Sequence, residues 1–303
     1  MTTKVGPPRI EPRRLAARAM IGAALAHVWR DPLRQPTAAE SISPADLAPL
    51  HDAWSLTAAG YDDLKLDELS LGELTPDRAS VEQLIRWLSS APQDRIAALD
   101  AVFGLVTSKD CPPHETDYCH WDDPTYRSSQ MADVGGFYRA FGVQPGGERP
   151  ERADHVSVEI EFVAFLYQKI ALAIESGDEQ HISVGQAAFE AFIRDHVTWW
   201  MPTFARCVQR RIERIHEPAE STPLATGLLA ALDGISDLLR AWVAIARLDA
   251  GLPVSREIIA PSLSILRPEE EESCGECETS SPCAASLADR PTPPGQPMRS
   301  DLS

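Results

Sequence analysis

Residues 152–176 read RADHVSVEIEFVAFLYQKIALAIES, and this stretch decides the fold class of the chain. Apolar residues recur at helical spacing from Val156 to Ile174, and further apolar residues such as Phe162 fill the other sides. Such spacing is typical of an α-helix, and a helix that is apolar nearly all round is buried. The stretch therefore predicts a long central helix in an all-α protein, with Asp154 as its N-cap.

The start of this helix carries several titratable residues. Asp154 and Glu161 share one helix face, and His155 and Glu159 share another. Glu159 and Glu161 are about 200° apart at roughly 100° per residue, so they cannot face solvent together. A buried helix with acidic groups at its start is expected to present them at a pocket or groove. The alternative is that Asp154 only caps the helix and His155 is an ordinary surface residue.

Most of the remaining chain also has the pattern of helices. N-capping residues, prolines at first helical positions and apolar residues at helical spacing define these segments. No run of β-branched residues alternates clearly enough to predict a strand. We predict a single compact all-α domain over residues 12–267, with about seven or eight helices. Besides the central helix they cover residues 12–29, 43–58, 80–88, 92–104, 125–141, 186–215 and 222–251.

Both ends of the chain have a different composition. Residues 1–11 and 268–303 contain few large apolar side chains, and the C-terminal segment is rich in proline, serine and glutamate. Such segments cannot bury enough apolar surface to become ordered, so we predict that both are disordered. The tail also carries Cys274, Cys277 and Cys283, which are a candidate metal site. Three thiolates are one ligand short of a closed zinc site, and the alternative is three reduced thiols.

The composition excludes several classes of protein. The 303 residues include 28 Lys+Arg and 45 Asp+Glu, which gives a net charge of −17. This charge argues against non-specific nucleic-acid binding, and it favours either a basic partner or simply solubility. No apolar run reaches the roughly 18 residues of a membrane span.

Arg13-Arg14 and the apolar residues after them resemble an export signal, but we interpret them as part of the first helix. The scattered cysteines favour the reducing cytoplasm.

Common active-site motifs are missing from the sequence. There is no Gly-x-Ser-x-Gly, no phosphate-binding loop, no Gly-x-Gly-x-x-Gly and no His-Glu-x-x-His. A di-iron site in a helical bundle needs two Glu-x-x-His pairs, and only Glu213–His216 fits. The sequence therefore contains none of these catalytic templates.

Two segments resemble a known family of chaperones. Residues 152–166 resemble the Pro-Asp-His-x-x-x-Glu-Leu-Glu-Phe-Met signature of the TorD/DmsD/NarJ family, with Ala153 in place of the usual proline. Residues 192–199, which include His196, resemble the Phe-x-x-x-His-x-x-Trp helix of the same family. Together with the helical pattern, the resemblance extends over about residues 15–265.

Two further segments resemble one branch of this family. Residues 111–118 resemble a Cys-Pro-Pro-Tyr-Glu-x-x-Tyr connector, with His114 in place of the aromatic residue. Residues 131–138 resemble the following helix, which ends in Gly-Phe-Tyr. Both patterns belong to members that serve dimethylsulfide, ethylbenzene, selenate and chlorate enzymes.

The resemblance implies a function as well as a fold. Members of this family are cytoplasmic chaperones for complex molybdenum oxidoreductases. The chain would bind the twin-arginine leader and the apo catalytic subunit of an enzyme of the DMSO reductase family. It would assist cofactor insertion and hold back export until the client is mature, without catalysing a reaction and without a cofactor of its own. Whether a guanine nucleotide or molybdopterin binds stays open, because the sequence has no nucleotide motif. Family members differ by exchanging helices, so a monomer and a homodimer both stay open.

An Arg-Arg leader that continues into an apolar stretch requires carboxylates beside an exposed apolar groove. The sequence places candidate charged residues at the start of the central helix, and aromatic residues on other helices. The aromatic residues have core packing as their alternative role. The predicted leader site comprises Asp154, His155, Glu159, Glu161, Tyr138, Trp87, His196 and Trp199, with Trp200 as a further candidate.

Two other classes of function remain as alternatives. One is a metal or iron–sulfur carrier that uses the cysteines of the tail, with Cys111, Cys119 and His120 as additional ligands. The other is a helical enzyme in which His155 and Asp154 act as an acid–base pair.

Overall fold

The computed structural model describes residues 10–30, 42–104, 110–119, 124–146, 150–216 and 223–256. Within these ranges the chain is helical and has no β-strand, so the all-α prediction is confirmed. Extended backbone pairs there only in an isolated bridge between His114 and His155. The predicted tail, its three cysteines, His120 and most of the predicted N-terminal segment lie outside the described ranges. No described helix has the length and apolar character needed to cross a bilayer.

The helices of the described chain, including short 3-10 and π-helical turns labelled η, follow one another without strands between them. In chain order they are α1 (Pro12–Val28), α2 (Pro44–Leu47), α3 (Pro49–Ala58), η2 (Leu66–Glu68), α4 (Ala79–Ser89), α5 (Pro92–Phe103), η3 (Glu115–Tyr118), α6 (Pro124–Ala140), α7 (Val156–Ser176), α8 (Glu179–Phe192), η4 (Ile193–Val197), α9 (Met201–His216) and α10 (Pro223–Asp249).

Two of the predicted helices are divided in the structure. The segment 43–58 forms α2 and α3, and the division falls at Pro49, the first residue of α3. The segment 186–215 starts earlier than predicted, because Asp178 caps α8 by accepting a hydrogen bond from the His181 backbone. It is then interrupted by the π-helical turn η4 before α9 begins. Pro202 lacks a backbone donor and its ring disfavours the preceding helical turn, which explains a new helix at this point.

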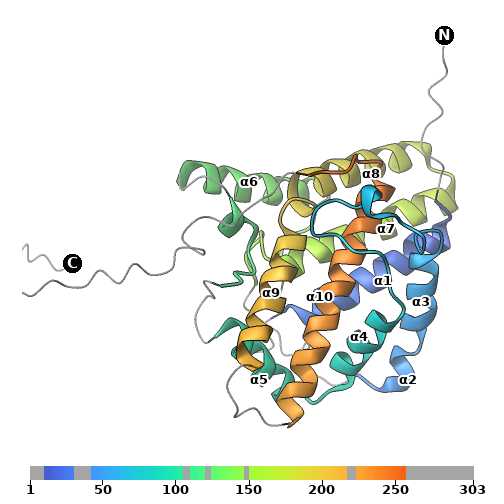
Figure 1. The fold of residues 1–303 in the computed structure, drawn as a ribbon. Helices are drawn as coiled ribbons and strands as arrows, with labels where there is room; N and C mark the ends of the chain where they lie inside the picture. The colour runs from blue at the N-terminus through green and yellow to red at the C-terminus, as the bar shows by residue number, and fades with distance from the viewer. Residues whose placement is uncertain are drawn as a thin grey trace, which may run out of the picture. The chain divides into compact units, whose positions relative to one another are not determined.

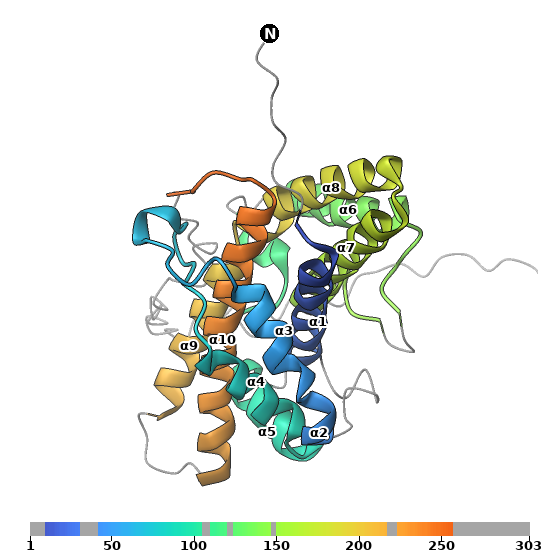
Figure 2. The same ribbon diagram turned by 90° about the vertical axis from the view of Figure 1, so that its right-hand side faces the viewer.

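The central helix α7 is buried, as the sequence predicted, and it packs against α1 and α8. Figure 2 shows α1 and α7 side by side, and Figure 1 shows α10 between α9 and α4. Gly22 allows the close approach of α1, because a Cβ there would lie 2.8 Å from Trp242 and 3.1 Å from Ala164. Arg18 of α1 pairs with Asp249 of α10 at 2.9 Å in the interior. These contacts place α1 in the core of the protein.

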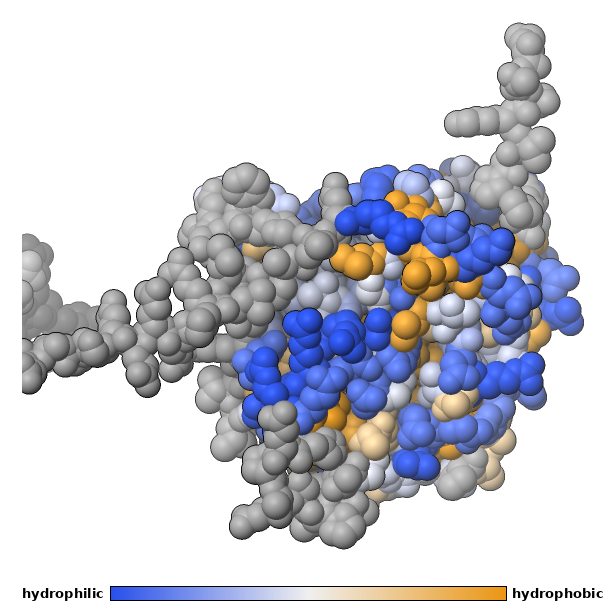
Figure 3. All heavy atoms as spheres, viewed as in Figure 1, coloured by the Kyte–Doolittle hydropathy of each residue, from blue (hydrophilic) through white to orange (hydrophobic). Residues whose placement is uncertain are grey.

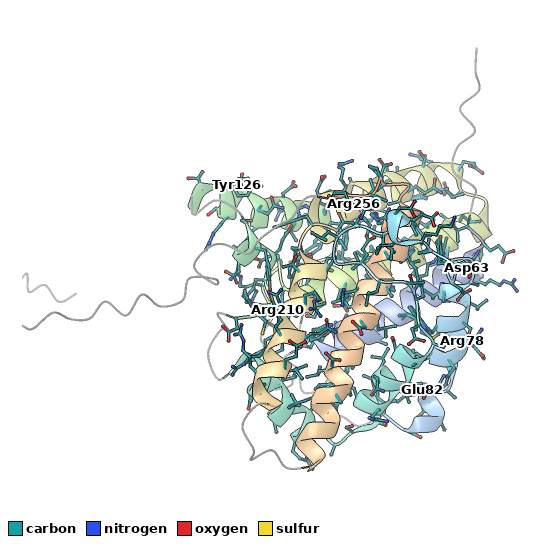
Figure 4. The ribbon with its side chains drawn as sticks, in the orientation of Figure 1. Asp63, Arg78, Glu82, Tyr126, Arg210 and Arg256 are labelled. Carbon is teal, nitrogen blue, oxygen red and sulfur yellow. The ribbon has the colours of Figure 1, made fainter. Side chains whose placement is uncertain are left out.

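Helix α6 lies at one side of the helical body and is held mainly through its C-terminal half (Figure 1). Val134 is buried, Phe137 packs edge-on against Phe192, and the Tyr138 hydroxyl donates to the Ala153 carbonyl at 2.8 Å. At its other end, Tyr126 points away from the body (Figure 4). On the face shown in Figure 3, polar side chains cover α9 and apolar ones gather near η2.

Candidate functional site

The start of α7 is joined to the connector segment 110–119 by backbone hydrogen bonds. The Glu115 amide donates to the Asp154 carbonyl at 2.9 Å, and the Val156 amide donates to the Pro113 carbonyl at 2.8 Å. The N-cap of α7 is His155, whose Nδ1 accepts from the Ser157 amide at 3.2 Å. The prediction that Asp154 caps this helix is therefore wrong. Its side chain points instead toward the connector, where the hydroxyl and the amide of Thr116 donate hydrogen bonds to it.

Asp154 is fully buried and fixes the connector to the start of α7. Its carboxylate accepts hydrogen bonds from the Thr116 hydroxyl at 2.7 Å and the Thr116 amide at 3.3 Å. Arg152 donates to both carboxylate oxygens, at 2.7 and 3.0 Å, and covers the group from the solvent side. The Arg152 side chain is 43% exposed, whereas that of Asp154 has no exposed surface. Asp154 therefore acts within the structure as a buried anchor.

A second buried cluster surrounds the carboxylate of Glu115. Nδ1 of His196 lies 3.2 Å from both carboxylate oxygens, and the indole of Trp199 and the amide of Gln130 each donate to one of them at 2.9 Å. The other imidazole nitrogen of His196 lies 3.3 Å from a carboxylate oxygen of Asp133 on α6. His196 belongs to η4, and π-helical turns occur frequently at functional sites. This cluster links the connector, α6 and η4.

Glu159 is the third buried carboxyl group of this region. One of its oxygens accepts a hydrogen bond from the Trp200 indole at 3.0 Å. Burial raises the pKa of Glu159 well above its usual value, and the nearby charges of Glu115 and Asp154 raise it further. Burial also raises the pKa of Glu115, although hydrogen bonding to His196 opposes the shift. Because Glu159 has no exposed surface, its carboxyl group is out of reach of an arginine at the surface.

A groove with a volume of about 790 Å³, named here the α1–α7 groove, lies on the other side of α7. Among the described residues that line it, most are apolar, Glu161 is the one acidic residue, and none is lysine or arginine. The Glu161 side chain is 55% exposed and forms an ion pair with Arg30, which follows α1. The lining residues are Ala16, Ala19, Met20, Ala23, Tyr138, Val143, Gln144, Pro145, Gly146, Val158, Glu161, Phe162, Ala164, Phe165 and Gln168.

The structure separates the residues of the predicted leader site into three places. Glu161 and Tyr138 line the α1–α7 groove. Trp87 is buried on α4, where it belongs to the core. The other five belong to the buried clusters behind the start of α7: Asp154, His155, Glu159, His196 and Trp199.

The sequence analysis did not select the residues that form hydrogen bonds with these buried polar groups. Arg152, Glu115 and Gln130 all lie in or beside the matching motifs, and a buried acid in a motif implies a donor nearby. In the described part of the chain, no three His, Cys, Asp or Glu side chains are placed to hold a metal ion. Cys111 and Cys119 are buried, and the metal site proposed for the tail lies outside the described ranges.

The connector, α6, α7 and η4 thus form one continuous structural unit around the buried carboxyl groups. Residues 73–206 match the family model of the nitrate reductase delta subunit. The match supports the NarJ/TorD-type chaperone family, and it includes the buried clusters and the α7 side of the groove. This is a family of molybdoenzyme maturation chaperones rather than of enzymes, which supports that general role here. No curated protein and no solved structure matches the chain significantly.

Proposed function

We propose that this protein is a cytoplasmic chaperone that binds the twin-arginine leader and the apo catalytic subunit of a molybdenum oxidoreductase. The client is an enzyme of the DMSO reductase family, and the connector motif favours the dimethylsulfide, ethylbenzene, selenate or chlorate type. Binding assists cofactor insertion and delays export until the client is mature. The family match and the motifs in α7, η4 and the connector support this proposal.

The α1–α7 groove is the observation that carries the proposal. Its α7 side runs from Val158 to Gln168, which is about 15 Å along a helix axis. Its α1 side is lined by small residues, including Ala16 and Ala23, which leave room for side chains of a bound segment. Its volume of about 790 Å³ is in the range of pockets that enclose a small ligand. The groove therefore fits a few apolar side chains of a leader.

The acidic residue of the groove is suited to the arginine pair of a twin-arginine leader. Glu161 lies near one end of the α7 side and is exposed, so it retains its charge while it lines an apolar surface. A leader arginine at Glu161 would then be followed by apolar residues along α7. Asp154, Glu115 and their partners support this surface from behind, because they fix the start of α7 and the segment that precedes α6.

Filling the groove tests the proposal. Ala23 lines the groove and is exposed, so Ala23→Phe would occupy the space of one bound apolar side chain. Burying such a side chain contributes about 1.5–3 kcal/mol, so the affinity should fall about 10- to 150-fold. The measurement is calorimetric titration of a synthetic peptide that carries Arg-Arg and an apolar stretch.

The matched control is Ala187→Phe, which makes the same change at an exposed alanine of α8 outside the groove. It should leave the affinity unchanged. Equal affinities of wild type and the Ala23 variant, or no binding of the peptide by wild type, would contradict the proposal.

A further inference from the structure

An ion pair joins Arg30 to Glu161, the acidic residue among the described lining of the α1–α7 groove. Arg30 lies just beyond the last residue of α1, and its guanidinium donates to a carboxylate oxygen of Glu161 on α7. The Arg30 side chain is 20% exposed and that of Glu161 is 55% exposed, so both are within reach of a bound segment. The one acidic residue of the groove is thus already neutralised by an arginine of the same chain.

We propose that Arg30 competes with the leader's arginine for Glu161 and thereby sets how strongly the groove prefers arginine. This inference rests on the proposed function. In the free protein Arg30 occupies the position of the client's guanidinium. Binding then exchanges one arginine–glutamate pair for another, and the exchange costs little because ion pairs at exposed positions contribute little to stability.

The charges around Glu161 support a single competing group. The groove lining contains no lysine or arginine within the described ranges of the chain. Lys169 lies over the ring of Phe165 at 5.4 Å, but it is eight residues beyond Glu161, about 12 Å along the helix. A leader without arginine leaves the pair of Arg30 and Glu161 intact and gains only apolar contacts. The preference of the groove for arginine is therefore a difference between two binding free energies. One is that of Glu161 with the leader's arginine, and the other is that of Glu161 with Arg30.

The test compares two peptides and three proteins by calorimetric titration. One peptide carries Arg-Arg before the apolar stretch, and the other carries Gln-Gln at the same positions. Arg30→Gln should bind the Arg-Arg peptide about 1.4- to 5-fold more tightly than wild type, the range expected for one exposed ion pair. The affinity for the Gln-Gln peptide should not change. Glu161→Gln should bind both peptides with similar affinity.

The control for net charge is Arg194→Gln. Arg194 pairs with Asp195 at 2.8 Å outside the groove, and its side chain is 52% exposed. This variant should bind both peptides like wild type. The gain in the Arg30 variant should also shrink at high salt, because exposed charges are screened.

The outcomes separate the inference from the proposed function. If wild type binds the Arg-Arg peptide and Arg30→Gln changes neither affinity, or changes both equally, the inference is overturned and the proposed function stands. If wild type binds neither peptide, both are overturned.

Discussion

The carboxyl group of Glu115 and the imidazole of His196 meet in the interior within hydrogen-bond distance, although 81 positions separate them in the chain. Both carboxylate oxygens lie 3.2 Å from Nδ1 of His196. The pair joins the connector before α6 to the π-helical turn after α8. It therefore holds together two segments whose motifs were recognised separately in the sequence.

Removal of this buried carboxylate should strongly destabilise the fold. Glu115→Ala leaves His196, Trp199 and Gln130 without their common acceptor. Leaving a buried hydrogen-bonding group without its partner costs about 1–3 kcal/mol, which urea unfolding would measure. Asp133→Asn is the control, because its side chain is 63% exposed and contacts the other nitrogen of His196. It should cost less than about 1 kcal/mol. Similar losses in both variants would contradict the assignment of Glu115 as the anchor.

Glu159 should make the stability of the protein depend on pH. Its pKa is raised in the folded state by burial and by the charges of Glu115 and Asp154. The folded state therefore binds more protons than the unfolded state between the unfolded pKa of about 4.5 and the raised folded pKa. Across this window, the contribution of Glu159 to the free energy of unfolding decreases as the pH rises.

Glu159→Gln removes this titration while its amide oxygen can still accept from Trp200. Relative to wild type, the variant should become progressively more stable as the pH rises above about 4.5. Urea unfolding at several pH values from 4 to 8 would measure the difference. Glu161→Gln, at an exposed position, should leave the slope unchanged. A stability difference that is independent of pH would exclude Glu159 as the titrating group.

Asp154→Asn should reduce stability more than client binding. The carboxylate holds Arg152 and Thr116 through charge-assisted hydrogen bonds, each of which contributes about 1.5–3 kcal/mol. We expect a lower melting temperature and a leader affinity within about twofold of wild type, because His155 still caps α7. Calorimetry and thermal unfolding of the same samples would measure both. An unchanged melting temperature with weaker binding would show direct contact between Asp154 and the leader.

Truncation before Pro268 tests the predictions for the tail. Removal of residues 268–303 should leave helicity and the melting temperature almost unchanged, because the segment is too polar to contribute to the core. Circular dichroism would measure both, and a loss of several degrees would contradict the prediction. Zinc that co-purifies with the full chain and not with the truncated one would support a metal site at Cys274, Cys277 and Cys283.

The sequence by itself determined the helical class and the position of the central helix. Helical periodicity is a local property, so the apolar residues from Val156 to Ile174 were enough to predict that α7 is buried. The motifs also placed the connector and η4 in one family resemblance. The break between α8 and α9 was missed, although Pro202 was its local signal.

Only the tertiary structure decided which acidic residue is available to a partner. Glu159 and Glu161 are two positions apart, and periodicity separated their faces without showing which face meets other helices. The structure buries Glu159 against Trp200 and leaves Glu161 in the groove beside Arg30, 131 positions away. Contacts over such distances depend on how whole helices pack, because each side chain is placed by elements that are remote in the sequence. The charge of the groove is therefore a property of the packed helices rather than of any single motif.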